Sequence, residues 1–174
     1  TFAFRYDSAG RLTTVLRDGV ETESYEFDAN GNRIRATTGA GTVVGSYDAQ
    51  DRLRTYGSAV YTYTLNGELR RRISGTDTTR YSYDAFGQLR AVRLASGDSI
   101  EYVLDATGRR VGKRVNGTRV RGWLYSGPLS ILAELDGAGA VVSRFVYVQR
   151  PNVPEYMVRG GQTYRLVTDE LGSV

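Results

Sequence analysis

The chain has 174 residues and a formal net charge of +4, and it contains neither cysteine nor histidine. These absences exclude disulfide frameworks, zinc sites built from Cys and His, thiol nucleophiles and Ser-His-Asp triads. The length suits one domain, and the small excess of positive charge permits an acidic partner without requiring one.

A turn motif first appears after a predicted strand over residues 1–6 and then recurs along the chain. It consists of an aromatic residue, Asp, two variable residues, Gly, a polar residue and an aliphatic residue. The copies that keep the aromatic residue, the Asp and the Gly have them at Tyr6, Asp7 and Gly10, at Phe27, Asp28 and Gly31, and at Tyr83, Asp84 and Gly87. A single copy would be a weak signal, but copies in register are a strong one.

Three further copies each replace one of these three residues. They are Tyr47-Asp48 with Asp51 in place of Gly, Tyr63-Thr64 with Thr in place of Asp, and Leu104-Asp105-Ala106-Thr107-Gly108 with Leu in place of the aromatic residue. The copies begin at positions 6, 27, 47, 63, 83 and 104, which are 16 to 21 residues apart. This regularity indicates an internal repeat.

The physical chemistry of the motif predicts a hairpin turn. An Asp that opens a turn accepts backbone N–H groups from the residues ahead of it. The Gly three residues later supplies the left-handed conformation that closes a type I turn with a bulge. Linking turns of another type follow at Asp18-Gly19, Ser96-Gly97-Asp98 and Asn116-Gly117. Each repeat is therefore predicted to be strand, turn, strand, linking turn, without a helix.

From Trp123 onward the repeats diverge. A more apolar stretch leads to a turn at Asp136-Gly137-Ala138-Gly139, and a last Asp-x-x-Gly motif follows at Asp169 and Gly172. We predict a hairpin array over residues 1–122 and divergent repeats of the same continuous domain over residues 123–174. Both ends are expected to continue into a longer protein. No apolar run approaches the roughly 18 residues of a membrane span, and no signal peptide is recognised.

These motifs resemble the YD-repeat, or RHS-repeat, family over essentially the whole chain, and Thr168-Asp169-Glu170-Leu171-Gly172-Ser173-Val174 resembles the segment leading into the RHS-associated core region. The resemblance implies a long β-sheet wound into a spiral shell. In bacterial polymorphic toxins and in the C component of insecticidal toxin complexes, such a shell encloses a C-terminal toxin domain. Teneurins use a similar shell in adhesion at the cell surface.

The candidate site residues are predicted to be structural. Each repeat has one motif Asp at its turn, which indicates turn capping better than paired carboxylates for glycoside hydrolysis. No nucleophile–base pair, metal site or cofactor site is predicted, so we expect no enzyme. The predicted turn residues are Asp7, Gly10, Asp28, Gly31, Asp48, Asp84, Gly87, Asp105, Gly108, Asp169 and Gly172.

Two features leave a binding function open. The first is a set of arginines that could contact a polyanion, namely Arg70, Arg72, Arg109, Arg110 and Arg114. The alternative for these is a solvated sheet face that deters edge-to-edge pairing. The second is a series of tyrosines that could stack on sugars but is better explained by packing between hairpins, namely Tyr61, Tyr63, Tyr81, Tyr83 and Tyr102.

The sequence thus predicts an all-β fold of tandem antiparallel β-hairpins forming a curved or spiral sheet, with a four-bladed propeller as the alternative architecture. The predicted function is a structural shell segment that encloses or displays a toxin or effector domain of the same longer chain. The alternative is a carbohydrate- or polyanion-binding adhesion module. Secretion or cell-surface exposure is expected, as is self-association through exposed sheet edges.

Overall fold

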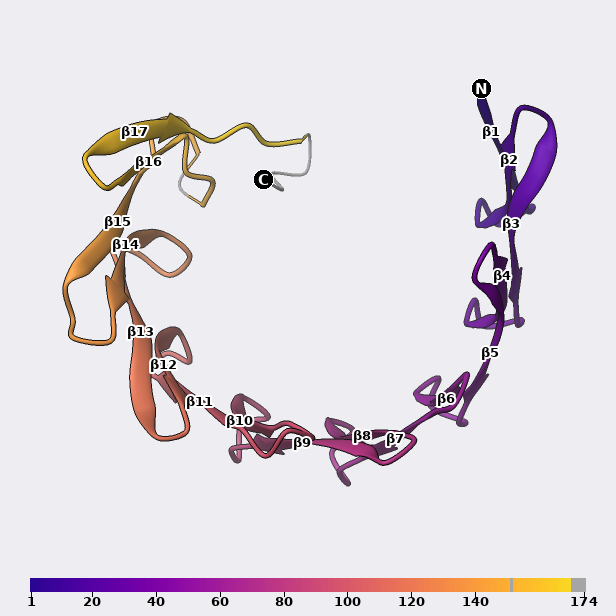
Figure 1. Cartoon of the computed structure of the whole chain (residues 1–174), viewed down its shortest axis with the longest axis horizontal. Coiled ribbons are helices and arrows are strands. Elements are labelled where there is room, and N and C mark those ends of the chain that lie inside the picture. The colour runs from indigo at the N-terminus through magenta and orange to yellow at the C-terminus, as the bar shows by residue number, and fades with distance from the viewer. Residues whose placement is uncertain (151, 170–174) are drawn as a thin grey trace. The chain divides into compact units, whose positions relative to one another are not determined.

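The computed structural model describes residues 1–150 and 152–169, which form β-strands joined by turns, with no helix among them (Figure 1). The chain divides into two compact units, Thr1–Thr78 and Thr79–Val174. Among the described residues, no helix is long and apolar enough to cross a membrane. The predicted change of repeat type at residue 122 stays a prediction.

The first unit is an antiparallel meander in which each strand pairs with the next one along the chain. Its strands are β1 (Phe2–Tyr6), β2 (Leu12–Arg17), β3 (Val20–Phe27), β4 (Arg33–Thr38), β5 (Gly41–Tyr47), β6 (Leu53–Tyr56), β7 (Ala59–Tyr63) and β8 (Leu69–Ser74).

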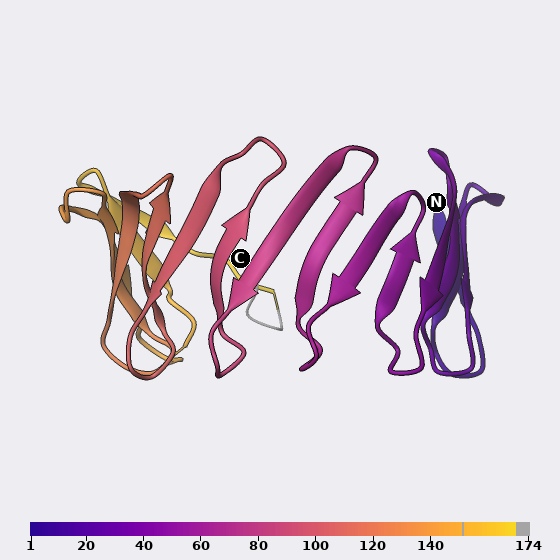
Figure 2. The same ribbon diagram turned by 90° about the horizontal axis from the view of Figure 1, so that it is seen from below.

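The second unit repeats this arrangement, and each of its strands is again antiparallel to the next. Its strands are β9 (Asp77–Tyr83), β10 (Leu89–Arg93), β11 (Ser99–Leu104), β12 (Arg110–Val115), β13 (Thr118–Tyr125), β14 (Ile131–Asp136), β15 (Val141–Val146), β16 (Tyr156–Arg159) and β17 (Gln162–Arg165). In both units the strands lie side by side and the turns alternate between two edges of the sheet (Figure 2).

This strand pairing confirms the all-β prediction of tandem antiparallel hairpins and shows that the propeller alternative is wrong. A propeller separates its sheet into blades of four strands. Here neighbouring strands are hydrogen-bonded from β1 through β8, so the first unit alone has a ladder twice the length of a blade. The sheet grows by adding hairpins at its side, as a repeat protein does.

A β-bulge follows each motif turn, because the returning strand holds one residue more than its partner. In the first hairpin, Tyr6 lies opposite Leu12 but Arg5 lies opposite Thr14, so Thr13 is the extra residue. The same shift occurs at the start of β4, β6, β8, β10, β12 and β14. The turn type therefore determines the register, as expected for a turn closed by a bulge.

The buried core includes small residues that lie beside aromatic ones, together with Val15, Val92 and Leu135. In the first unit the buried Ala36 lies opposite Tyr25, and the buried Ala59 lies opposite Tyr56. Tyr56 also lies opposite Gly45, where an added Cβ would lie 3.4 Å from the Tyr56 ring. Burial within a sheet therefore comes from tyrosine rings that cover small residues on the adjacent strand.

The motif turns all lie at one end of the strands, and we call this side of each sheet the YD edge. The side at the other end of the strands is the linking edge. The YD edge of the first unit holds the turns after β1, β3, β5 and β7, and that of the second unit holds those after β9, β11, β13 and β15. Because the repeats alternate strand direction, every motif Asp in the predicted copies lies on a YD edge. Side chains of successive motifs are therefore neighbours along that edge.

Candidate functional site

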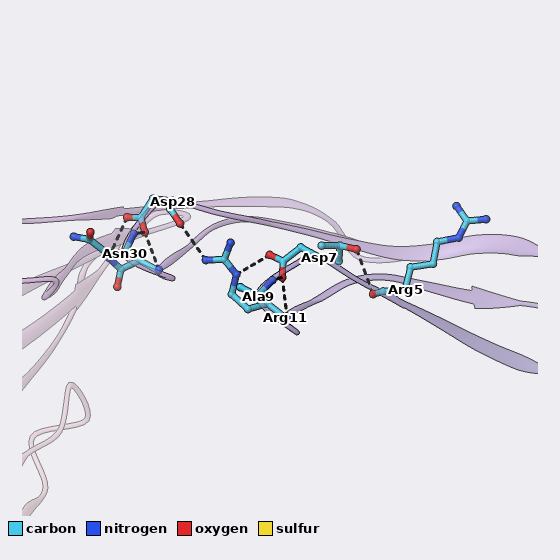
Figure 3. Close-up of polar contacts among 8 residues, drawn as sticks. Arg5, Asp7, Ala9, Arg11, Asp28 and Asn30 are labelled. Carbon is cyan, nitrogen blue, oxygen red and sulfur yellow. Dashed lines mark hydrogen bonds and ion pairs between the residues drawn. The ribbon is translucent and has the colours of Figure 1, made fainter.

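The turn at Asp7 shows how one motif is built (Figure 3). One carboxylate oxygen of Asp7 accepts the backbone N–H of Ala9 at 2.9 Å and that of Arg11 at 2.9 Å. The backbone carbonyl of Asp7 accepts the N–H of Gly10 at 3.0 Å, and Gly10 has a φ of 77°. A left-handed φ strains any residue with a Cβ, which explains the choice of Gly at this position.

The other predicted Asp turns have the same hydrogen bonds. In each, one carboxylate oxygen accepts the N–H groups two and four residues ahead, at Asp28, Asp48, Asp84 and Asp105. The closing residues likewise have positive φ, at Gly31, Asp51, Gly87 and Gly108. Asp169 is described but Gly172 lies outside the described residues, so the last predicted turn is not tested.

Thr64 replaces Asp in one motif and keeps part of the pattern. Its hydroxyl accepts the backbone N–H of Glu68 at 3.2 Å, and Gly67 closes the turn with a φ of 96°. The carbonyl of Thr64 accepts the N–H of Gly67 at 3.1 Å. The backbone turn therefore survives a change of capping residue, because a hydroxyl can accept the same N–H group.

The residue four positions after the motif Asp connects one repeat to the next. Arg109 donates from Nε to the Asp105 carboxylate at 2.7 Å and from Nη1 to the carbonyl of Gly127, in the next motif turn, at 3.0 Å. Its guanidinium also lies 5.0 Å from the centre of the Tyr125 ring. One side chain thus completes its own turn and holds its neighbour through charge-assisted and cation–π contacts.

Two more arginines occupy the same place in the first unit. Arg11 donates to the Asp7 carboxylate at 2.7 Å and to the carbonyl of Asp28 at 3.1 Å, and lies 4.9 Å from the Phe27 ring centre. Arg52 donates to the Asp48 carboxylate at 2.7 Å and lies 5.0 Å from the Tyr63 ring centre. We call this contact the forward staple.

A second connection runs backward from the aromatic residue of the motif. The Tyr hydroxyl donates to the backbone carbonyl of the first residue after the preceding motif turn. These bonds are Tyr47 to Arg33 at 3.2 Å, Tyr63 to Leu53 at 2.8 Å, Tyr125 to Arg110 at 3.0 Å and Tyr147 to Ile131 at 3.0 Å. At these four places a repeat is therefore tied to the previous one by a Tyr hydroxyl, a contact that we call the backward tie.

Sequence reasoning missed two of these aromatic positions. Tyr125 and Tyr147 continue the period after Leu104 with spacings of 21 and 22 residues, although neither is followed by Asp. In the first motif turn the Asp7 N–H donates to the Arg11 carbonyl at 3.0 Å, and the Tyr125 turn has the same bond from the Ser126 N–H to the Ser130 carbonyl at 3.0 Å. The spacing alone could have identified both tyrosines, even where the Asp and Gly are absent.

Asp136 reproduces the motif turn at the linking edge. Its carboxylate accepts the N–H groups of Ala138 at 3.0 Å and Ala140 at 2.9 Å, and Gly139 has a φ of 92°. The sequence predicted a turn here but not one of the motif type. The same turn hydrogen bonds therefore occur at both the YD edge and the linking edge.

One family model, described as the teneurin YD-shell, matches the chain over residues 1–174. The chain belongs to the teneurin YD-shell family. This confirms the resemblance to YD and RHS repeats. No match was found among curated proteins.

Solved structures similar to this YD-shell chain have low sequence identity to it. The crystal structure of TcdB2-TccC3-TEV is 15% identical over 98% of the chain with a TM-score of 0.47. A Tc holotoxin pore of Photorhabdus luminescens with a mutated TccC3 is 13% identical over 98% of the chain with a TM-score of 0.44. The YD-shell chain spans 12% and 13% of the length of those two chains.

Hydrogen bonds lower the pKa of three motif carboxylates of this YD-shell chain. Backbone and side-chain bonds from Arg11 lower the pKa of Asp7 from its ordinary 3.8. A side-chain bond from Asn32 lowers the pKa of Asp28. A bond from Thr107, reinforced by Arg109, lowers the pKa of Asp105 well below its usual range. Donors aimed at the charged form explain the direction of all three shifts.

The predicted polyanion residues do not share one role in the YD-shell sheet. Arg109 makes a forward staple, and Arg110 lies 3.7 Å from the centre of the Tyr102 ring. Arg70 and Arg72 are exposed in the first unit, and Arg114 is exposed in the second. Arg109 and Arg110 are therefore engaged in packing, whereas the other three present their charge to solvent.

The tyrosines proposed for sugar stacking are also partly covered. Arg52 lies over Tyr63 and Arg110 over Tyr102, so a guanidinium already contacts each of these rings. Tyr61 and Tyr81 are half-buried within their sheets. In the part of the chain that the structure describes, no cluster of three or more His, Cys, Asp or Glu could hold a metal ion. These YD-shell contacts favour packing between repeats.

Proposed function

We propose that this chain is a load-carrying wall segment of a larger YD shell that encloses or displays another domain of the same longer protein. The observation that supports the proposal is that neighbouring repeats are joined by up to three kinds of contact. These are the strand ladder, the forward staple and the backward tie, as at Arg109, Tyr125 and Arg110. The enclosed partner would be a toxin or effector domain.

Each unit is a single layer of β-sheet. A lone hairpin is only marginally stable in water, and a single sheet cannot bury a conventional core. The buried hydrophobic residues in the described part of the chain are few, and half of them are alanines, namely Ala36, Ala59 and Ala133. Stability must therefore come from contacts between adjacent repeats, which supports a continuous wall better than a compact catalytic domain.

We propose no catalytic activity for this segment and a secreted or cell-surface location for the parent protein. The motif carboxylates are occupied by turn N–H groups and by residues such as Arg11 and Arg109. A carboxylate held in this way is a poor general base, because its hydrogen-bond donors stabilise the ionised form.

Protease protection in the full parent protein tests the shell proposal. The domain that follows this segment should resist added protease in the intact protein. It should become sensitive when Arg11, Arg52 and Arg109 are all replaced by Ala, because the forward staples are lost. Replacement of three arginines without staple contacts, Arg54, Arg70 and Arg93, is the control. Equal cleavage of the domain in all three proteins would contradict enclosure.

Self-association through sheet edges is a separate proposal for the isolated chain. Strand β1 displays Phe2, Phe4 and Tyr6 with exposed fractions of 61%, 54% and 60%. Unpaired strand edges with exposed apolar side chains favour intermolecular pairing. Light scattering after size exclusion should detect a dimer or larger species at high concentration. A clean monomer would contradict it.

A carbohydrate- or polyanion-binding function is the second candidate. The observation that favours it is a group of exposed arginines on one face of the second unit, which includes the predicted residue Arg114. A heparin column with a salt gradient separates the two functions, because a purely structural segment should elute at low salt.

A further inference from the structure

Four arginines lie on one face of the second unit, as two directly opposed pairs. Arg80 on β9 lies opposite Arg93 on β10, and Arg114 on β12 lies opposite Arg119 on β13. Side chains of directly opposed residues leave the same face, with Cβ atoms about 5 Å apart. All four side chains are exposed.

The strand register places both pairs on the same face. Arg93 shares its face with Ala91, two residues earlier, which lies opposite Glu101 on β11. Glu101 in turn lies opposite Arg114. The row therefore extends across five consecutive strands, a width of about 19 Å from β9 to β13 at the usual strand separation.

The two pairs are electrostatically uncompensated. Within residues 1–150 and 152–169, no ion pair or hydrogen bond engages the guanidinium groups of these four arginines. Glu101, half-buried between the pairs, is the one acidic side chain in the row, and it forms no ion pair with Arg114. Like charges directly opposite each other on a sheet are destabilising. The fold therefore carries a cost here that an anionic ligand would relieve.

A shallow pocket lies between the pairs. Its volume is about 410 Å³, and its lining includes Ala91, Glu101, Val103 and Arg114 together with Arg90. The small Ala91 side chain leaves room above the sheet, with arginines on both sides. An extended ligand could lie across the strands and contact both arginine pairs.

We infer that this face, which we call the arginine row (Arg80, Arg93, Arg114 and Arg119), binds a linear sulfated glycan. Guanidinium groups match sulfate and carboxylate groups with paired hydrogen bonds. Single-stranded nucleic acid is a poorer fit, because it needs free aromatic faces and Arg110 covers the Tyr102 ring. An acidic peptide is also a poorer fit, because the face of a sheet offers no free backbone groups.

This inference names a ligand class and a site for the second candidate function. It does not depend on the shell role, because the arginine row lies apart from the staples and ties. Failure of glycan binding would leave the protease-protection result untouched, and the reverse also holds. The two proposals can therefore fail separately.

Calorimetric titration of the 174-residue chain with a heparin dodecasaccharide tests the arginine row. One residue is removed from each pair in the variant Arg93→Ser/Arg114→Ser. The matched control, Arg70→Ser/Arg72→Ser, removes equal charge from exposed positions of the first unit. We expect the first variant to bind at least about fivefold more weakly, with a smaller dependence on salt, and the control to bind within about twofold of the unmodified chain.

Thermal unfolding of the same variants distinguishes a binding role of these arginines from a structural role. Loss of like-charge repulsion should leave the unfolding temperature of Arg93→Ser/Arg114→Ser unchanged or raise it, while binding falls. Equal weakening in the control, or no binding by the unmodified chain at physiological salt, would overturn the inference. Equally tight binding of polyglutamate or of oligothymidylate at matched charge would overturn the choice of a glycan.

Discussion

Two motif turns, one at Asp105 and one at Asp28, contact the next repeat through different side chains. After Asp105, Arg109 reaches the carbonyl of Gly127 in the next turn. After Asp28, the shorter Asn32 cannot reach so far, and the next repeat supplies Asp51, whose carboxylate accepts the Asn32 amide at 2.7 Å. The contact between repeats is thus preserved while its chemistry changes.

A third example shows the residue four positions after the motif Asp lying against the following turn. An added Cβ on Gly108 would lie 2.2 Å from Nε2 of Gln88, the residue four positions after Asp84. At Gly31 the same Cβ would lie 3.6 Å from the Arg11 guanidinium. The motif glycine therefore has two roles, since it permits a positive φ and leaves space for the neighbour's side chain.

The largest expected loss of stability follows removal of the Arg109 side chain, which makes the longer of the two contacts between repeats. Arg109→Ala removes a charge-assisted bond to Asp105, a bond to Gly127 and a cation–π contact, and should lower the free energy of unfolding by about 2 kcal/mol. Asn32→Ala should cost about 1 kcal/mol. Urea unfolding of the chain measures both. Equal losses would show that the forward staple is no stronger than the amide contact.

The two roles of the motif glycine can be separated by alanine substitution. Gly10→Ala should destabilise by about 1 kcal/mol, because φ is positive but no atom lies within 4 Å of the new Cβ. Gly108→Ala should cost about 1.5 kcal/mol, because Gln88 must also move. In the double variant Gly108→Ala/Gln88→Ala, the additional cost of Gly108→Ala over Gly10→Ala should disappear. If Gly10→Ala proved the more damaging, the close approach of Gln88 would be unimportant.

The backward tie should contribute about as much as one buried hydrogen bond. Tyr147→Phe removes only the hydroxyl that donates to Ile131 and should cost about 1 kcal/mol. Tyr164→Phe is the control, since its hydroxyl donates locally to Gln162 and is exposed. Hydrogen exchange should show faster opening near β14 in the first variant alone. An unchanged pattern there would argue against the tie.

Replacement of a motif carboxylate should have the smallest effect on stability at neutral pH. It is the most diagnostic substitution in acid. Because folding lowers the pKa of Asp105, its stabilising contribution is complete above about pH 3.8 and is lost as the pH falls through the folded-state pKa. Asp105→Asn should therefore be less stable than the unmodified chain at pH 7, and the gap should narrow below pH 3.8. Unfolding midpoints between pH 7 and pH 2.5 measure it, and a gap that widened in acid would contradict the sign.

Local chemistry made the hairpins predictable. Asp7 and Gly10 act within five consecutive residues, so their hydrogen bonds and left-handed φ depend little on the rest of the chain. The alternation of Tyr81 and Tyr83 likewise indicated strands before any pairing was known. Tyr125 and Tyr147 escaped prediction because neither is followed by the Asp and Gly of the motif, whereas their own partners are carbonyls in the preceding repeat.

By itself, the amino-acid sequence determined the turns, the strands and the period of this YD-shell chain, because these features arise from interactions among residues close together in the chain. Only the tertiary structure decided what the side chain four positions after each motif Asp contacts, and which arginines lie opposite each other. Those contacts join residues such as Arg109 and Gly127, or Arg80 and Arg93, that are brought together by strand register. Register depends on the bulges after the motif turns, and a shift by one residue would move each side chain to the other face.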